Sequence, residues 1–242
     1  MASQPMTPPT TMVQSQSNVD WWSSAWAEIG YLGTAGETGT ATFNEYGDLS
    51  AGLLVSSAGF LAENRSSALY FSANAGNVGR NDQTYQLTVG RYGSFNATLS
   101  FDSIPHAFST NAKVLWDGAG TGRLTLPSSL TPGASTAPQV QAAIDAVLPS
   151  ELSLKREKTG MSLNYTPDEF VDLFFKFGYE ERQGTRPLGG TFGYPFQNGM
   201  TEIAEPIEYR TFDVNGGVRF KGETLQANLT YIGSFFRNDI PA

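Results

Sequence analysis

The feature that most constrains this chain is an alternation of apolar and polar residues with a period of two, repeated in runs of about ten residues. The run around Leu99 shows it clearly. Its apolar positions are Phe95, Ala97, Leu99 and Phe101, and its polar positions are Ser94, Asn96, Thr98, Ser100 and Asp102. Because successive side chains point to opposite faces of a β-strand, this run predicts a strand with one apolar and one polar face.

Similar runs recur along the chain. They lie at 84–89, 161–165, 171–179, 211–221 and 224–231, with further candidates at 25–33, 51–61 and 66–74. Tight turns are predicted at 91–93, 166–168 and 221–223. The pattern therefore predicts roughly nine strands of about ten residues, the length with which a tilted strand crosses a bilayer.

Composition separates this pattern from a soluble β-sandwich, which also alternates. Charged residues make up 16% of the chain, below the usual level of about 25%. The predicted strands exceed the common length of about five or six residues. Their apolar faces end in aromatic residues, as interfacial girdles do: Tyr85, Phe95, Phe101, Tyr165, Tyr179, Phe212, Phe220 and Tyr231. We therefore predict an all-β fold, an antiparallel transmembrane β-barrel of the outer-membrane type.

The predicted organisation is a disordered or extended lead over 1–20 followed by a barrel portion over 21–242. Long loops are expected at about 103–150, which is rich in Pro, and at 183–206; the first could hold a short helix over 139–148. The N-terminal residues lack the features of a signal peptide, and the chain ends without a terminal aromatic strand. With an odd number of predicted strands, these features suggest an incomplete barrel, part of a longer protein.

The sequence offers no convincing catalytic or metal-binding set. Cys is absent and His106 is the single His, so neither a zinc site nor a catalytic triad is indicated. The carboxylates of 180–181 and 168–169 are adjacent, so on a strand they would point to opposite faces. The Gly-rich stretch 76–80 lacks the end of a phosphate-binding loop. A net charge of -8 argues against a nucleic-acid partner. We expect no enzyme activity and no cofactor in this chain.

Several segments in order resemble the MtrB/PioB family over about residues 25–240. They lie at 43–49, 77–85, 90–93, 104–112, 124–127 and 206–209. Within them we mark twelve residues whose role the resemblance leaves unassigned: Asn44, Glu45, Tyr46, Asp48, Gly79, Arg80, Asp82, Gln83, Ile104, Pro105, His106 and Asn111. Family members are much longer than this chain, and the Cys pair of some members is missing here.

The resemblance implies a bacterial outer-membrane barrel that ensheathes a periplasmic multihaem (decahaem) c-type cytochrome for extracellular electron transfer. The haem would belong to the partner, and a second, extracellular multihaem cytochrome could join at the outer surface. A polar lumen would offer hydrogen-bonding groups to such a guest, while the apolar face meets outer-membrane lipid. Candidate lumen-facing residues are Asp172, Lys176, Asp213, Arg219 and Lys221.

Two alternatives remain at this point. A general solute porin would share the barrel and would conduct ions without any cytochrome. A surface hydrolase or lectin on a soluble β scaffold would be active or bind carbohydrate without detergent. The missing catalytic set weighs against the second alternative, whereas only the family resemblance separates the sheath from the porin.

Overall fold

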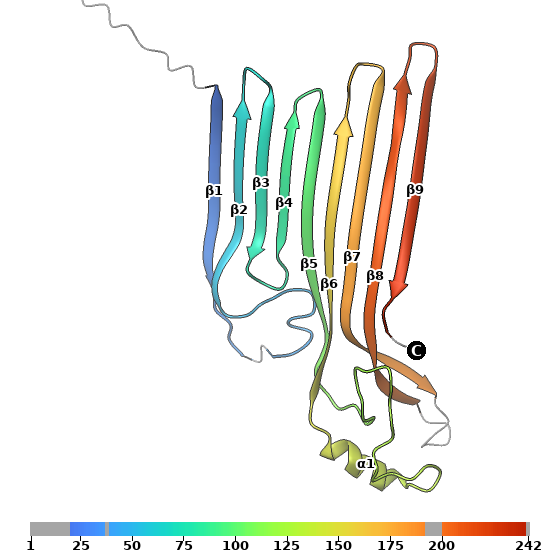
Figure 1. Cartoon of the computed structure of the whole chain (residues 1–242). Helices are drawn as coiled ribbons and strands as arrows, with labels where there is room; N and C mark the ends of the chain where they lie inside the picture. The colour runs from blue at the N-terminus through green and yellow to red at the C-terminus, as the bar shows by residue number, and fades with distance from the viewer. Residues whose placement is uncertain (1–19, 37–38, 192–199, 241–242) are drawn as a thin grey trace, which may run out of the picture.

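The structure is a computed structural model that describes residues 20–36, 39–191 and 200–240, and within them the chain forms one antiparallel sheet. The elements in order are β1 (Trp21–Leu32), β2 (Gly52–Asn64), β3 (Leu69–Val78), β4 (Thr84–Arg91), β5 (Phe95–Ala112), α1 (Ala137–Ala146), β6 (Ser150–Tyr165), β7 (Val171–Thr191), β8 (Met200–Lys221) and β9 (Gln226–Asn238). Each strand pairs with its neighbours in the sequence, so the sheet is a simple meander (Figure 1). The predicted all-β class and antiparallel pairing are confirmed.

The connections are all short at one end of the sheet, whereas the other end carries long connections beside the short 79–83 turn between β3 and β4 (Figure 1). Residues 65–68, 92–94, 166–170 and 222–225 join the strands at the short end, which confirms the three predicted turns. Gly93 adopts a φ of 74°, a left-handed conformation that suits Gly in a tight turn. At the other end, 33–51 joins β1 to β2 and 113–149 joins β5 to β6. This asymmetry is typical of outer-membrane barrels.

Both predicted loops are shorter in the structure than the sequence indicated. The predicted boundaries of 103–150 are wrong at the start, since β5 continues to Ala112. Those of 183–206 are wrong at both ends, since β7 runs to Thr191 and β8 begins at Met200. Proline had suggested loops here, but a strand accepts proline where its missing N–H would face no partner.

Pro105 and Pro206 meet this condition. On β5 the N–H of Ser103 bonds the carbonyl of Gln83 at 3.1 Å, so Pro105, two residues on, also points toward the β4 side. The paired part of β4 ends before that level, at the pair Thr84–Asp102. Pro206 likewise points to the side of β9, whose pairing with β8 ends at Tyr209.

The 113–149 connection has a small apolar core of its own. Leu115, Leu130 and Val140 are buried, and Trp116, Leu126, Ala143 and Ile144 pack around them. The helix begins two residues earlier than predicted, where the Gln139 side chain accepts a hydrogen bond from the Thr136 N–H at 2.8 Å. Val140 and Ile144 face this core, whereas Leu148 lies beyond the helix and is exposed.

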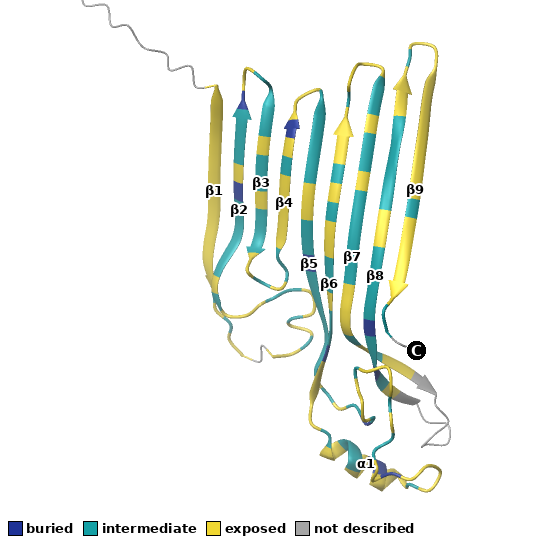
Figure 2. Ribbon diagram, viewed as in Figure 1, coloured by how far each residue is buried: buried dark blue, intermediate teal, exposed yellow. Residues whose placement is uncertain are grey.

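The sheet is open. Within the described residues, β1 pairs only with β2 and β9 only with β8, in agreement with the predicted incomplete barrel. Almost every residue of β1 is exposed (Figure 2). The predicted lead lies outside the described residues except for Asp20. Among the described residues, no helix has the length and apolar character needed to cross a membrane.

Candidate functional site: the two faces of the sheet and an inward-folded loop

The register gives the sheet one apolar and one polar face. Directly paired residues share a face, so Leu99 on β5 lies beside Leu87 on β4 and Met161 on β6. No element within the described residues covers this face, and its large side chains are exposed: Leu99 is 51% exposed, Tyr231 63% and Leu229 73%. A continuous uncovered apolar surface is costly in water and suits hydrocarbon.

The apolar band stops abruptly toward the long-loop end. One row across the strands is largely aromatic: Tyr85, Phe101, Thr159, Tyr179, Phe212 and Phe235. The next row on the same face is polar or charged: Ser103, Glu157, Glu181, Arg210 and Arg237. Arg210 pairs with Glu181 at 3.3 Å and with Asp239 at 3.0 Å. From Val171 near the short turn to Tyr179, nine residues span about 27 Å, close to a tilted bilayer crossing.

All five candidate lumen residues lie on the opposite, polar face. The pairs Asp172–Arg219 and Lys176–Asn215, and the alternation along β8, place them there together. Asp172 forms an ion pair with Lys221 at 2.5 Å. The Asp213 carboxylate accepts a hydrogen bond from Ser234 at 2.7 Å. The face continues across β3–β5 with Asn, Gln, Ser and Thr side chains at its positions.

The loop between β1 and β2 folds over this polar face at the long-loop end. The carbonyl of Glu45 accepts a hydrogen bond from the Ala107 N–H at 3.0 Å, where β4 no longer flanks β5. The His106 ring stacks on Tyr46 at a centroid distance of 4.4 Å and contacts Phe108 at 4.1 Å. Because His106 is paired with Leu154 on the polar face, the loop lies over the inner side of the sheet.

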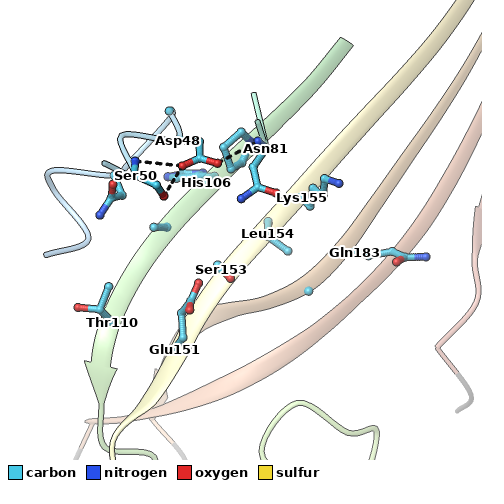
Figure 3. A pocket seen from close by; sticks show the side chains of 15 residues that line it. Asp48, Ser50, Asn81, His106, Thr110, Glu151, Ser153, Leu154, Lys155 and Gln183 are labelled. Atoms are coloured by element: carbon cyan, nitrogen blue, oxygen red, sulfur yellow. Dashed lines mark hydrogen bonds between the residues drawn. The ribbon is translucent and has the colours of Figure 1, made fainter. Parts of the chain in front are cut away.

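Asp48 holds this loop to the β3–β4 turn. Its carboxylate accepts hydrogen bonds from the Ser50 hydroxyl at 2.5 Å and the Asn81 N–H at 3.1 Å (Figure 3). The Arg80 guanidinium donates to the carbonyls of Asp48 and Ser50, each at 2.8 Å, and lies 3.7 Å from the carboxylate. The Ser50 hydrogen bond, followed by the Asn81 and Ser50 backbone bonds and the charge of Arg80, lowers the pKa of Asp48 against the opposing effect of its burial.

The turn that receives Asp48 is itself well fixed. Gly79 has a φ of 80°, and its N–H bonds the Gln83 side chain at 3.2 Å. The Asp82 carboxylate accepts from the Asn77 amide at 3.1 Å. The buried Ser103 hydroxyl donates to the Asn81 carbonyl at 2.7 Å, which attaches the turn to β5.

Most of the marked residues therefore meet at one place, although they come from three segments. The loop supplies Asn44, Glu45, Tyr46 and Asp48, the turn supplies Gly79, Arg80, Asp82 and Gln83, and β5 supplies Ile104, Pro105 and His106. Asn111 lies apart at the end of β5, where its N–H bonds Ser109. Sequence reasoning missed that the loop folds inward. Asp48, Arg80 and His106 come from three separate segments of the sequence, and nothing in those segments indicates the direction in which the loop folds.

A cavity of about 620 Å³ lies between the folded loop and strands β5–β7 (Figure 3). Its lining is polar and of mixed charge, with Asp48, His106, Glu151, Lys155 and Gln183 among its residues. The His106 imidazole is 3.7 Å from the Glu45 carboxylate and contacts the rings of Tyr46 and Phe108, an arrangement that helps to fix the loop. In the described part of the chain no group of three or more His, Cys, Asp or Glu side chains could hold a metal ion.

A sheet with a bilayer-sized apolar band on one face and a polar opposite face defines the wall of an outer-membrane β-barrel. Comparison with known proteins agrees: residues 38–242 match the family model described as "Putative outer membrane beta-barrel porin, MtrB/PioB". The chain belongs to the MtrB/PioB family and is an outer-membrane protein. It is 30% identical over 169 residues to the outer membrane protein MtrB of Shewanella baltica (strain OS185), a match that covers 69% of this chain. The chain spans about a quarter of that relative's length, 24%.

Proposed function

We propose that this chain is a wall segment of a barrel that ensheathes a periplasmic multihaem (decahaem) c-type cytochrome and positions it for electron transfer across the outer membrane. In this proposal the polar face lines the lumen, so that Asp172, Lys176, Asp213, Arg219 and Lys221 face the guest. The protein supplies insulation and position, and the partner supplies the haem. The observation that carries the proposal is the pairing of an uncovered apolar face with a mostly polar opposite face across β3–β9.

The polar face suits a protein guest in hydrogen-bonding capacity. A protein with charged and polar surface groups cannot lie in hydrocarbon without losing several kcal/mol for each unpaired group. On the polar face, amide and hydroxyl side chains take the place of the water that would otherwise hydrogen-bond the guest. They lie in the rows Asn74–Gln86–Ser100 and Ser72–Thr88–Thr98. The opposite face meanwhile presents Leu and aromatic side chains to lipid.

The length of the MtrB relative also favours a sheath over a narrow pore. The 169 matched residues are 24% of the MtrB relative, which makes that protein about 700 residues long. With nine strands in 242 residues here, the same strand density gives roughly 26 strands. Barrels of 16–18 strands already leave an aqueous channel, and those of 22 strands enclose a plug. A lumen of this size would let water and solutes cross the membrane unless a guest filled it.

Purification of the full-length protein from detergent-solubilised outer membranes tests the proposal. We expect a stoichiometric haem protein to accompany the barrel, detected by absorbance at the Soret band. The control is an unrelated outer-membrane barrel purified from the same membranes. A barrel that carries no haem, when expressed together with its neighbouring genes, would overturn the proposal.

A general solute porin is the second candidate, because the family description names a porin. The polar face would then line a water-filled channel. Planar-bilayer recording of the purified protein separates the two functions. A porin conducts steadily as isolated from the membrane, whereas a sheath conducts only after its guest has been stripped away.

A further inference from the structure

Charged side chains are unevenly distributed over the polar face. On its β1–β5 half, the described residues include three acidic side chains and no Lys or Arg: Glu28, Glu63 and Asp102. The β6–β9 half, from the row of Arg156 and Arg182 to the short turns, holds Asp172, Glu180 and Asp213 against six basic residues. These are Arg156, Lys158, Lys176, Arg182, Arg219 and Lys221. This excess of basic residues is opposite in sign to the net charge of the whole chain, which is -8.

Half of these basic groups have no ion-pair partner within the described residues. Arg156 and Arg182 share Glu180, at 2.5 and 2.7 Å, and Lys221 is paired with Asp172. No such pair holds the other three: Lys158, Lys176 and Arg219. All three are exposed, and Arg219 lies 4.8 Å above the ring of Phe174.

The three groups form a line across adjacent strands, which we name the basic stripe (Lys158, Lys176 and Arg219). Lys158 on β6 is paired with Glu180, four residues from Lys176 on β7. Arg219 on β8 is paired with Asp172, four residues from Lys176 in the other direction. The stripe therefore extends about 27 Å along the wall, with steps of about 13 Å. Steps of this size exceed the screening length of about 8 Å at physiological salt, so each cation can meet its own partner group.

We propose that the basic stripe is the contact surface for a carboxylate-rich face of the protein guest, formed by Asp and Glu side chains. The inference rests on the proposed sheath function and adds the chemistry and location of the contact. An exposed ion pair contributes little by itself, but several opposite charges along one line orient a partner and exclude others. The neutral β3–β4 part of the wall would make no comparable contact, so the guest would have one preferred rotation in the lumen.

Carbodiimide coupling tests the contact directly, because it joins a Lys amine to a carboxylate only when the two touch. In the full-length complex we expect an amide between Lys158 or Lys176 and an Asp or Glu of the haem partner, identified by mass spectrometry. The Lys158→Arg/Lys176→Arg variant keeps both charges but offers no amine. We expect it to retain the partner and to lose the coupled product.

Neutralisation gives an independent measurement. We expect Lys158→Gln/Lys176→Gln/Arg219→Gln to reduce the haem retained per barrel at physiological salt by about threefold or more, and to weaken the release of partner by added salt. The matched control neutralises three exposed cations away from the stripe, Arg65, Lys113 and Arg123, and should retain the partner normally.

The outcomes separate this inference from the function on which it rests. A wild-type barrel that carries haem, gives no coupled product at either lysine and loses no partner on neutralisation would overturn the contact and leave the sheath standing. A wild-type barrel without haem would overturn the sheath, and the contact with it.

Discussion

At the scale of single residues, Asp48 shows how one carboxylate can fix a loop over the inner face of a barrel wall. It is 14% exposed and bonds groups from two segments, its own loop and the β3–β4 turn. Hydrogen bonds to a charged group contribute about 1.5–3 kcal/mol each to stability. Loss of the charge should therefore release the loop without unfolding the sheet, whose pairing does not involve Asp48.

The lowered pKa of Asp48 gives this loop a pH dependence of defined sign. A carboxyl whose pKa is lower in the folded loop stabilises it fully above its ordinary pKa of 3.8, and the stabilisation is lost as the pH falls through the folded value. We expect hydrogen exchange in 39–50 to accelerate only under such acidic conditions. In Asp48→Asn, exchange should be about tenfold faster at neutral pH and insensitive to this titration. A loop that exchanges equally in both proteins would contradict this role.

The sequence predicted part of the site at this scale. Polarity alone selected five residues on β7 and β8, and the structure places all five on one face. The family segments pointed to Asp48, Arg80 and His106, but their grouping depends on the path of an irregular loop. Such a path has no periodicity from which it could be read.

At the scale of elements, the alternation of apolar and polar residues predicted the strands because one face of the sheet meets lipid and the other meets the hydrated lumen. Leu99 and Thr98 are neighbours on β5 with opposite orientations. An Arg on the lipid-facing side near the middle of the bilayer costs about 2–4 kcal/mol, whereas a lumen position remains hydrated. We expect Leu99→Arg to impair folding into liposomes and Thr98→Arg to leave it intact, measured by the heat-dependent gel shift. Equal behaviour of the two variants would mean that the faces are assigned wrongly.

Strand ends were predicted less well than strand middles, for a physical reason. Pro105 and Pro206 were read as breaks, yet each points to a side on which the neighbouring strand has ended. Whether a proline is tolerated depends on that neighbour, which lies far away in the sequence. The β5–β8 region, with Arg186 paired to Glu205 at 2.5 Å, also continues past the apolar band. Hydrophobic alternation reports the part of a strand that meets lipid and is silent beyond it.

At the scale of the whole molecule, the unequal connections predict an orientation. Outer-membrane barrels have short periplasmic turns and longer extracellular loops. The 222–225 turn should then face the periplasm, and the 113–149 connection with α1 should face the outside. We expect an epitope tag inserted after Gly133, an exposed position in that connection, to bind antibody on intact cells. A tag after Gly222 should bind only after the cells are permeabilised. The reverse result would mean that the barrel has the opposite orientation in the membrane.

The change from aromatic to charged residues at the pair of rows through Tyr179 and Glu181 has a consequence for the proposed electron transfer. Moving the barrel outward or inward by one pair of residues, about 7 Å, would bring Arg210 and Glu181 into hydrocarbon or strip the aromatic row of its interface. The protein is thereby held at one depth in the membrane. A redox guest bound to its wall would share that depth, so the distances from its terminal haems to the aqueous phases on both sides would be constant. Electron tunnelling falls off steeply with distance, and a fixed depth would keep its rate the same from one complex to the next.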